Sequence, residues 1–405
     1  MPRLSIKRNK PFSNSGCVTS DISRQFTMMS RLSQILDRMM PPSAKGGLRF
    51  DRPLLLLQSD DWGRMGVRDR EGFDELRAAG IDLGESPYDF YSLETAEDLA
   101  ALSDALKKHR DSAGRNPSMV MNFIMANVDF NRALSAGEDE IPLVPLNHGL
   151  PGKWRRPGLL EAYRQGIEDG VFFPALHGVT HFCAKGVTRE LDTCGERRDL
   201  LRKMWAAETP YIYRRMTWIG YEYWDPELEP ERRFLSRDEQ RSAIDRAAEI
   251  FRRCFQAAPF SACAPGYRAN HDTRASWFEA GIRVSQNGPG GRKEPFLDER
   301  GMLHTFRTVE MEPRTAPMDL RKLVDNVEAC FHRGLPAVVS IHSINFHSTI
   351  RNFRGPTLSL LDEFLTVLKK RWPEMLFVND ADLFRIATEG SYFADGAKIE
   401  VGVAA

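Results

Sequence analysis

The chain has 405 residues, 42% of them hydrophobic and 28% charged, and its 56 basic side chains are balanced by 56 acidic ones. This composition is typical of a globular enzyme, and the balanced charge gives no reason to expect a nucleic-acid or membrane-surface partner. No stretch approaches the roughly 18 apolar residues that a membrane span requires. A chain of this length can bury a large core, as one α/β domain or two smaller ones.

The N-terminal region is predicted to lie outside the main domain. Its first 27 residues are basic and rich in serine and lack the apolar segment of a secretory signal. We expect either a transit-like peptide or an extension before an internal start at Met28 or Met29, and a cytoplasmic location. Residues 31–40 place apolar side chains on one helical face, which predicts a helix docked on the domain, with a membrane-surface anchor as the alternative. Six scattered cysteines without a C-x-x-C pair indicate reduced thiols that are mostly buried.

Strand-sized apolar runs alternate with amphipathic helical patterns from residue 52 onward. Strands are expected at 52–58, 118–125, 171–176, 260–264, 282–285, 337–341 and 376–378. Helices are expected at 93–109, 158–168, 236–256, 274–280, 320–333 and 358–371. Repeated β-then-α units predict a parallel sheet, closed as a barrel or open. We place this domain at residues 50–390, between an N-terminal extension (1–49) and a C-terminal tail (391–405).

One region, at about residues 186–235, departs from the βα pattern. It combines a charged stretch with an irregular series of aromatic residues that a βα unit does not require. These are Trp205, Tyr211, Tyr213, Trp218, Tyr221, Tyr223 and Trp224. The region is either a lid with its own small core or a set of aromatic faces placed over a cleft to stack on a sugar-like ligand.

Two predicted strand ends carry residues suited to metal chemistry. Asp60 and Asp61 follow the apolar run 52–58. They are either a helix cap with a surface turn, or one metal-binding carboxylate beside a second carboxylate that is free to act as a base. His177 and His181 follow the strand 171–176 with a spacing that places both imidazoles on one face of a helical turn, within reach of a single cation. Cys183 is close enough to be a further ligand, although a buried thiol is its ordinary role.

Two further strand ends carry polar residues. Pro265 opens a turn in which Arg268 and Asn270 follow closely, more than turn chemistry alone requires. His342 ends the strand 337–341, either as a satisfied core histidine or as a general acid. Because ligands bind at the carboxyl ends of parallel strands, all four ends are expected to face one site.

In this chain order, the motifs SDDWG, HGVTHF, APGYRAN and SIHSIN resemble those of the polysaccharide deacetylase (NodB-homology, carbohydrate esterase) superfamily, in its bacterial polysaccharide (de)acetylase branch. The resemblance spans about residues 52–387. It implies a distorted (β/α) barrel of parallel strands, of the glycoside hydrolase/deacetylase type. Two departures stand out: Trp62 occupies a position where glycine is usual, and Arg268 follows the proline of its turn instead of preceding it.

The resemblance also implies roles for individual residues. Asp61, His177 and His181 would hold one divalent metal, zinc by first choice, with cobalt, nickel or iron as alternatives. Asp60 would be the general base, oriented by Arg268, and His342 the general acid. A backbone N–H near Tyr267 would stabilise the oxyanion. Substrate-binding residues would be Trp62, Pro265, Tyr267, Asn270, Asn345 and Glu222. The reaction would remove an N-acetyl or O-acetyl group from a carbohydrate or glycan precursor.

Two other functions fit parts of the sequence. A glycoside hydrolase on a related barrel needs two carboxylates about 5–10 Å apart, with Glu222 or Asp225 as a partner for the Asp60–Asp61 pair. A sugar-binding protein that kept the fold and lost activity is the second alternative. A phosphate-binding G-x-x-x-x-G-K-[ST] loop, a G-x-G-x-x-G fingerprint and a G-x-S-x-G elbow are all absent from the sequence.

Overall fold

The computed structural model describes residues 46–135, 140–213, 215–290 and 292–404. All the features reported below lie in the second of two units into which the chain divides, residues 43–405. The helix predicted at 31–40 and Cys17 lie outside the described residues.

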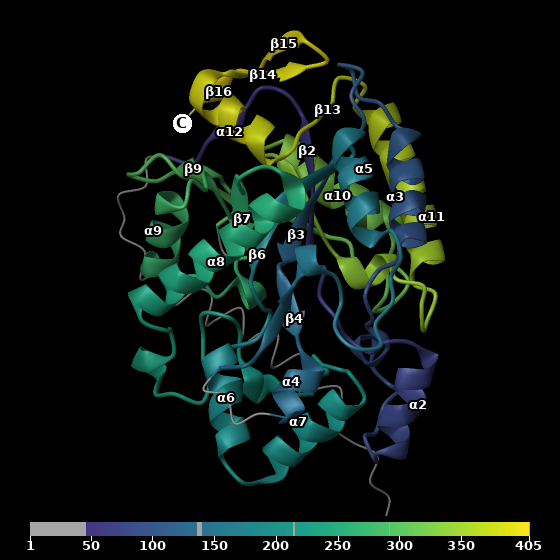
Figure 1. Cartoon of the computed structure of the whole chain (residues 1–405). Coiled ribbons are helices and arrows are strands. Elements are labelled where there is room, and N and C mark those ends of the chain that lie inside the picture. The colour runs from purple at the N-terminus through teal and green to yellow at the C-terminus, as the bar shows by residue number, and fades with distance from the viewer. Residues whose placement is uncertain (1–45, 136–139, 214, 291, 405) are drawn as a thin grey trace, which may run out of the picture. The chain divides into compact units, whose positions relative to one another are not determined.

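A curled sheet of ten strands forms the centre of the second unit (Figure 1). Hydrogen-bonded neighbours follow the order β11, β12, β2, β3, β6, β7, β8, β10 and β9, while β13 pairs with the start of β2. Only β9 runs antiparallel to its neighbour among these described strands. The strands are β2 (Leu54–Trp62), β3 (Met119–Ile124), β6 (Phe172–Gly178), β7 (Ser261–Cys263), β8 (Val284–Asn287), β9 (Phe296–Leu297), β10 (Leu303–Phe306), β11 (Val309–Glu310), β12 (Ala337–His342) and β13 (Leu376–Phe377).

One short segment bridges β8 and β12, near the two ends of this strand order. β10 pairs with β8, and β11 pairs with β12. Between them, the Arg307 N–H donates to Asn287 O in β8 (3.2 Å) and the Thr308 N–H donates to Val338 O in β12 (3.0 Å). The sheet therefore curls until a single bent segment spans both strands. The predicted fold class, an α/β barrel of parallel strands, is confirmed in this form.

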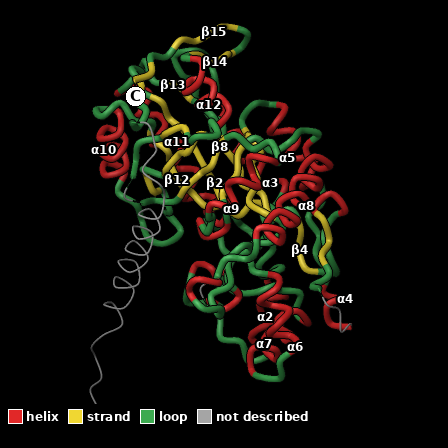
Figure 2. The backbone as a smooth tube through the Cα atoms, turned by 90° about the vertical axis from the view of Figure 1, so that its left-hand side faces the viewer, coloured by secondary structure: helices red, strands yellow, loops and turns green. Residues whose placement is uncertain are grey.

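Helices surround the sheet, as Figure 2 shows with strands at the centre and helices around them. They are α2 (Arg70–Ala78), α3 (Ala96–Lys107), α4 (Phe130–Ser135), α5 (Leu159–Glu168), α6 (Ala184–Asp192), α7 (Glu196–Ala206), α8 (Arg237–Phe255), α9 (His271–Glu279), α10 (Leu320–Phe331), α11 (Arg354–Arg371) and α12 (Asp380–Glu389). The predicted helices agree closely with α3, α5, α8 and α10. α9 begins three residues before its prediction because the Asn270 side chain caps it by accepting the Thr273 N–H.

The inner face of the sheet changes from apolar to polar along each strand. Side chains alternate between faces, so Leu54, Leu56, Gln58 and Asp60 share one side of β2. Leu54 and Leu56 belong to a buried apolar cluster that also contains Leu383 and Ile386 of α12. The same change recurs in three other strands, from Val120 to Asn122, from Val284 to Gln286, and from Val338 to Ser340 and His342. The carboxyl ends of the strands thus enclose polar groups.

Short antiparallel pairs complete the described structure. β1 (Arg49–Phe50) pairs with β16 (Val403–Ala404), β14 (Ser391–Ala394) pairs with β15 (Ala397–Glu400), and β4 (Ala126–Val128) pairs with β5 (Leu143–Pro145). The region predicted as a C-terminal tail, 391–405, is therefore part of the domain over its described residues. Tyr392 and Val401 extend the apolar cluster of α12, which explains why this segment packs.

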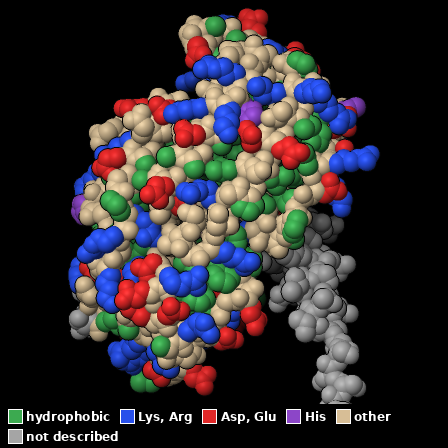
Figure 3. Space-filling model, turned by 90° about the vertical axis from the view of Figure 1, so that its right-hand side faces the viewer, with side chains coloured by type: hydrophobic (Ala, Val, Ile, Leu, Met, Phe, Trp, Pro, Cys, Tyr) green, Lys and Arg blue, Asp and Glu red, His purple; other side chains and the backbone are tan. Residues whose placement is uncertain are grey.

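Surface and cysteine predictions hold for the described residues. Cys183, Cys254, Cys263 and Cys330 are buried free thiols, and Cys194 is an exposed one. In the described part of the chain, every helix is too short or too polar to cross a bilayer. The face drawn in Figure 3 intersperses basic and acidic side chains, in keeping with the balanced composition. The cytoplasmic location stays a prediction.

The packing of α12 beneath the sheet gives a test of the fold. Ile386→Ala removes a fully buried side chain from the apolar cluster and is expected to lower the free energy of unfolding by about 2–5 kcal/mol. Phe393→Ala, at a residue that is 59% exposed, is the control and should change it by no more than about 0.5 kcal/mol. Urea unfolding measures both, and equal effects would contradict the packing described here.

Candidate metal centre

The four strand ends singled out in the sequence meet at one end of the sheet. His342 is the register partner of Asp60, so β12 and β2 place these residues side by side. His177 ends β6, and its Nδ1 is 2.8 Å from Cys263 O at the end of β7, just before the Pro265 turn. The predicted convergence is therefore found in the structure.

Asp61, His177 and His181 form a compact group of ligand atoms. Asp61 Oδ1 lies 3.5 Å from His177 Nε2 and 3.1 Å from His181 Nε2. Their side chains are only 3%, 2% and 6% exposed. One carboxylate oxygen and two imidazole nitrogens at these separations can converge on a single cation, as zinc sites with two histidines do.

The hydrogen bonds around this group leave the right atoms free for a cation. The Nδ1–H of His177 donates to a backbone carbonyl, so its Nε2 carries the lone pair. His181 Nδ1 bonds the Tyr211 hydroxyl at 2.9 Å, which likewise turns Nε2 toward Asp61. Asp61 Oδ1 is buried without a hydrogen-bond partner among the described residues. Burial lowers the pKa of His181 to about 4, which keeps the ring neutral as a metal ligand must be. The residues therefore fit the metal that the resemblance implies.

The backbone at Asp61 is held in an unusual conformation. Its φ of 75° lies in the left-handed region, which an aspartate seldom adopts without support. Support comes from the Tyr91 hydroxyl and the Ser343 hydroxyl, which donate to the Asp61 carbonyl at 2.8 and 3.3 Å. Gly63 follows at φ 74°, where a Cβ would lie 2.9 Å from the Ile124 carbonyl oxygen.

Asp60 is an ionised carboxylate whose Oδ1 is held by two donors. Burial opposes its charge, but the Arg307 guanidinium, together with the nearby His177 and His342 rings, outweighs burial and lowers the pKa of Asp60 to about 2. Arg307 Nη2 donates to Oδ1 at 2.6 Å, and Asn122 Nδ2 donates to the same oxygen at 2.8 Å. Oδ2 faces His342 Nε2 at a distance of 4.0 Å. This geometry suits a general base.

The arginine that orients Asp60 is Arg307 and not Arg268, which corrects the prediction. Arg268 instead places its guanidinium over the Trp224 ring, 4.7 Å from the centroid. The turn after Pro265 directs it there because Tyr267, with φ 58°, reverses the backbone before it. Arg307 was missed because the strand β10 before it was not predicted. Its signal is the strand-like segment Leu303–Phe306, which ends in an arginine.

His342 is paired with a buried acid that the sequence reasoning also missed. Its Nδ1 bonds Glu312 Oε1, and its backbone N–H donates to the same oxygen at 3.1 Å. Asn345 Nδ2 donates to Glu312 Oε2 at 2.7 Å, and Arg314 forms an ion pair with that oxygen. Burial lowers the pKa of His342 to about 4, so the ring is neutral near pH 7. At 24%, it is the most exposed of the predicted catalytic and metal-binding histidines.

A second ligand group is geometrically feasible but chemically poorer. Asp60, His177 and Cys263 also bring ligand atoms together. Asp60 already pairs with Arg307, and burial beside Asp60 raises the pKa of the Cys263 thiol well above its usual range. Since a thiol binds metal as thiolate, this group is less suited to a cation than Asp61 with the two histidines.

Most of the predicted substrate contacts have roles inside the protein. Trp62 is fully buried and stacks on Phe346, 5.7 Å between centroids, because the tight turn points it into the core. Glu222 accepts the N–H groups of Val179 and Thr180, so it braces the loop between the two histidines.

The other predicted contacts are engaged similarly. Asn270 caps α9, Asn345 is fully buried, and Pro265 is buried at the start of its turn. The Tyr267 N–H donates to Ala264 O at 2.8 Å, so the expected oxyanion donor is already bonded. The half-buried Tyr267 side chain lies under Arg307, 5.5 Å from centroid to guanidinium carbon.

The aromatic region contributes side chains both to the core and to the surroundings of the predicted ligands. Trp205 and Tyr223 are buried in the main apolar cluster, so the region shares the core of the domain instead of forming a small core of its own. Tyr213 and Tyr221, with hydroxyls 3.2 Å apart, face the His181 ring at centroid distances of 5.5 and 5.7 Å. These two side chains therefore border the metal ligands.

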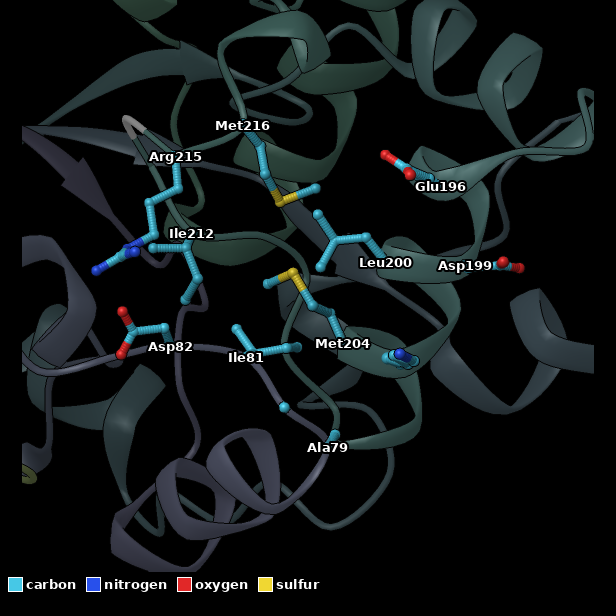
Figure 4. Close-up of a pocket in the computed structure, with 12 residues that line it drawn as sticks. Ala79, Ile81, Asp82, Glu196, Asp199, Leu200, Met204, Ile212, Arg215 and Met216 are labelled. Carbon is cyan, nitrogen blue, oxygen red and sulfur yellow. The ribbon is translucent and has the colours of Figure 1, made fainter. Parts of the chain in front are cut away.

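A cavity of about 450 Å³ lies elsewhere, between the end of α2 and α7 (Figure 4). Ile81, Leu200, Met204, Ile212 and Met216 contribute apolar surface to it, and charged residues such as Asp82 and Arg215 surround them. Its lining includes none of the predicted site residues, so it is separate from the metal centre.

No family model and no curated protein matches the chain. Among solved structures, it is similar to a CE4 family pseudoenzyme from Bacillus anthracis, with 12% identity over 82% of this chain and 66% of that chain, and a TM-score of 0.36. It is also similar to a family 4 acetyl xylan esterase from Clostridium thermocellum, in complex with a cobalt ion. The identity is 11% over 82% of this chain and 91% of that chain, and the TM-score is 0.37. With PuuE allantoinase, the identity is 12% over 86% of this chain and 93% of that chain, and the TM-score is 0.43.

Family 4 carbohydrate esterase structures are thus among the structural neighbours of this chain, in line with the family that its motifs resemble. These neighbours include an esterase and a pseudoenzyme, and the identities are low, so the reaction must be argued from the residues of this chain.

Replacing each of the two arginines in turn tests which one pairs with Asp60. Arg307→Met leaves a buried, unpaired carboxylate and is expected to lower the free energy of unfolding by about 3–5 kcal/mol. Arg268→Met is the matched control, expected to cost only about 1 kcal/mol because it loses one cation–π contact at a half-buried position. Urea unfolding compares them, and a larger loss for Arg268→Met would overturn the assignment.

Proposed function

We propose that this protein is a metal-dependent hydrolase that removes an acetyl group from the nitrogen or oxygen of a carbohydrate or glycan precursor. The observation that carries the proposal is the unpartnered Asp61 Oδ1 facing two imidazole Nε2 atoms, beside a separate ionised carboxylate, Asp60. Three protein ligands leave room for water and substrate, as in catalytic sites. Zinc is our first choice, and cobalt, nickel or iron suit the same ligands.

The chain's own residues supply the proton transfers. When bound, a divalent cation polarises the acyl carbonyl and lowers the pKa of a water toward about 7. Asp60 Oδ2, which is turned away from Arg307, accepts a proton from the attacking water as its oxygen bonds to the acyl carbon. His342 Nε2, which is unprotonated while Nδ1–H donates to Glu312, receives that proton from Asp60, 4.0 Å away, and delivers it to the leaving nitrogen or oxygen as that bond to the acyl carbon breaks. The products are acetate and the deacetylated sugar.

Two contacts fix His342 for this role. Glu312 binds Nδ1 and so directs Nε2 toward Asp60, 4.0 Å from its Oδ2. Because His342 is more exposed than the metal-binding residues, we expect the substrate to approach from its side, with the leaving group beside this ring.

The glycoside hydrolase alternative is disfavoured by the state of its candidate carboxylates. Glu222 is buried and accepts two backbone N–H groups, and Asp225 is buried in an ion pair with Arg189 at 2.6 Å. Neither is available to flank a glycosidic bond with Asp60. A sugar-binding protein without activity remains as a distinct outcome of the experiment below.

Metal content and turnover separate the roles of the histidines. His177→Gln removes a ligand and should lose the metal, whereas His342→Gln should keep it and lose about 10²-fold or more in kcat. His332→Gln, at a surface histidine that is 71% exposed, is the control and should change neither. Elemental analysis and acetate release from a panel of N- and O-acetylated sugars provide the measurements.

Three results would contradict the proposal in different ways. Full metal occupancy in His177→Gln would rule out the proposed metal centre. Shortened glycans without acetate would favour a glycosidase. Retained metal and sugar binding, without hydrolysis of any acetylated sugar in the panel, would favour the inactive binding protein.

A further inference from the structure

Asp61 has a second cationic partner that the predicted metal site does not require. Arg64 Nη1 lies 2.7 Å from Asp61 Oδ2, and the two side chains are only 4% and 3% exposed. Oδ2 is thus bound to a guanidinium, while Oδ1 is left to face the histidines. A fixed positive charge therefore shares one carboxylate with the proposed metal.

Arg64 is held in place by tyrosines that also build the metal site. Its guanidinium carbon lies 4.2 Å from the Tyr91 ring centroid, 5.1 Å from that of Tyr211 and 5.4 Å from that of Tyr213. Tyr91 also donates to the Asp61 carbonyl, and Tyr211 also bonds His181. The position of Arg64 is therefore fixed by the same contacts that position two of the ligands.

The electrostatic consequence follows from burial. A carboxylate without a partner in this interior is strongly unfavourable, and a buried guanidinium offsets that cost. The same guanidinium repels a divalent cation that binds to the other carboxylate oxygen. An arginine in this place thus stabilises the metal-free protein and weakens metal binding at the same time.

We propose that Arg64 is a built-in counter-ion of the metal centre, which keeps the metal-free protein folded and makes its metal exchangeable. The claim that Arg64 makes the metal exchangeable rests on the proposed metal centre. The claim that it keeps the metal-free protein folded rests on the Arg64–Asp61 pair alone.

The metal half is tested by comparing wild type with Arg64→Met, which keeps an apolar side chain among the tyrosines. The variant is expected to bind zinc about tenfold more tightly, or more, in competition with a chelator, since both the repulsion and the pairing of Asp61 in the metal-free state are lost. The rise in Tm on adding zinc should be larger in Arg64→Met than in wild type. Equal zinc affinity and an equal rise in Tm would overturn this half.

Arg115→Met is the matched control. Arg115 forms a similar pair with Asp382 at 2.8 Å, with side chains 16% and 5% exposed, and also lies over a tyrosine, Tyr392. It is outside the metal centre, so this variant should lose stability while its zinc affinity and its zinc-induced rise in Tm match those of wild type.

The counter-ion half is tested without metal. With chelator present, Arg64→Met should lower Tm by about 5 °C or more, and adding Asp61→Asn to it should restore most of that loss because the unpaired charge is gone. Failure of the double variant to recover would overturn the counter-ion role even where Arg64→Met unfolds. If wild type binds no zinc, the metal centre fails instead, and this cycle still decides the Arg64–Asp61 pair.

Discussion

Two adjacent buried carboxylates, each matched by a buried guanidinium, are the constraint on which the rest of this site depends. Asp60 pairs with Arg307 from the segment between β10 and β11, and Asp61 pairs with Arg64 from the turn after β2. Neither carboxylate could remain ionised inside the sheet without its partner. The pairing divides the two residues into different tasks, because each guanidinium binds one oxygen and leaves the other toward the histidines.

The fold supplies this arrangement through the inner face of the curled sheet. The face is apolar where α12 closes one end, and becomes polar toward the carboxyl ends of β2, β3, β8 and β12. Asn122 and Gln286 exchange hydrogen bonds at 2.8 and 3.0 Å, and Asn122 continues to Asp60. These two buried amides thus bind each other and the barrel, so the base is fixed by the sheet and not by a mobile loop.

Much of this could be predicted from sequence, and the exceptions share a cause. Seven of the ten strands of the sheet, six of the described helices and the convergence of Asp61, His177, His181 and His342 were predicted, because they lie in or directly after strongly patterned segments. Arg307, Glu312 and Arg64 were not, because their partners are fixed only by tertiary contacts with residues distant in sequence or by a tight turn. Trp62 and Glu222 were predicted to bind the substrate, but they contact the protein interior. The sequence beside a motif does not show whether an aromatic or acidic side chain faces a ligand or the core. Only packing separates the two cases.

The long reach of the contacts around Asp61 has a consequence for how the protein is made. The Ser343 hydroxyl donates to the Asp61 carbonyl across 282 positions of the chain, and β12 completes one side of β2. During synthesis, the turn bearing the first carboxylates emerges long before the strand that supports it. Contacts of such high sequence separation form late and slowly, so the edge of β2 that β12 covers stays unpaired until the last third of the chain has been synthesised.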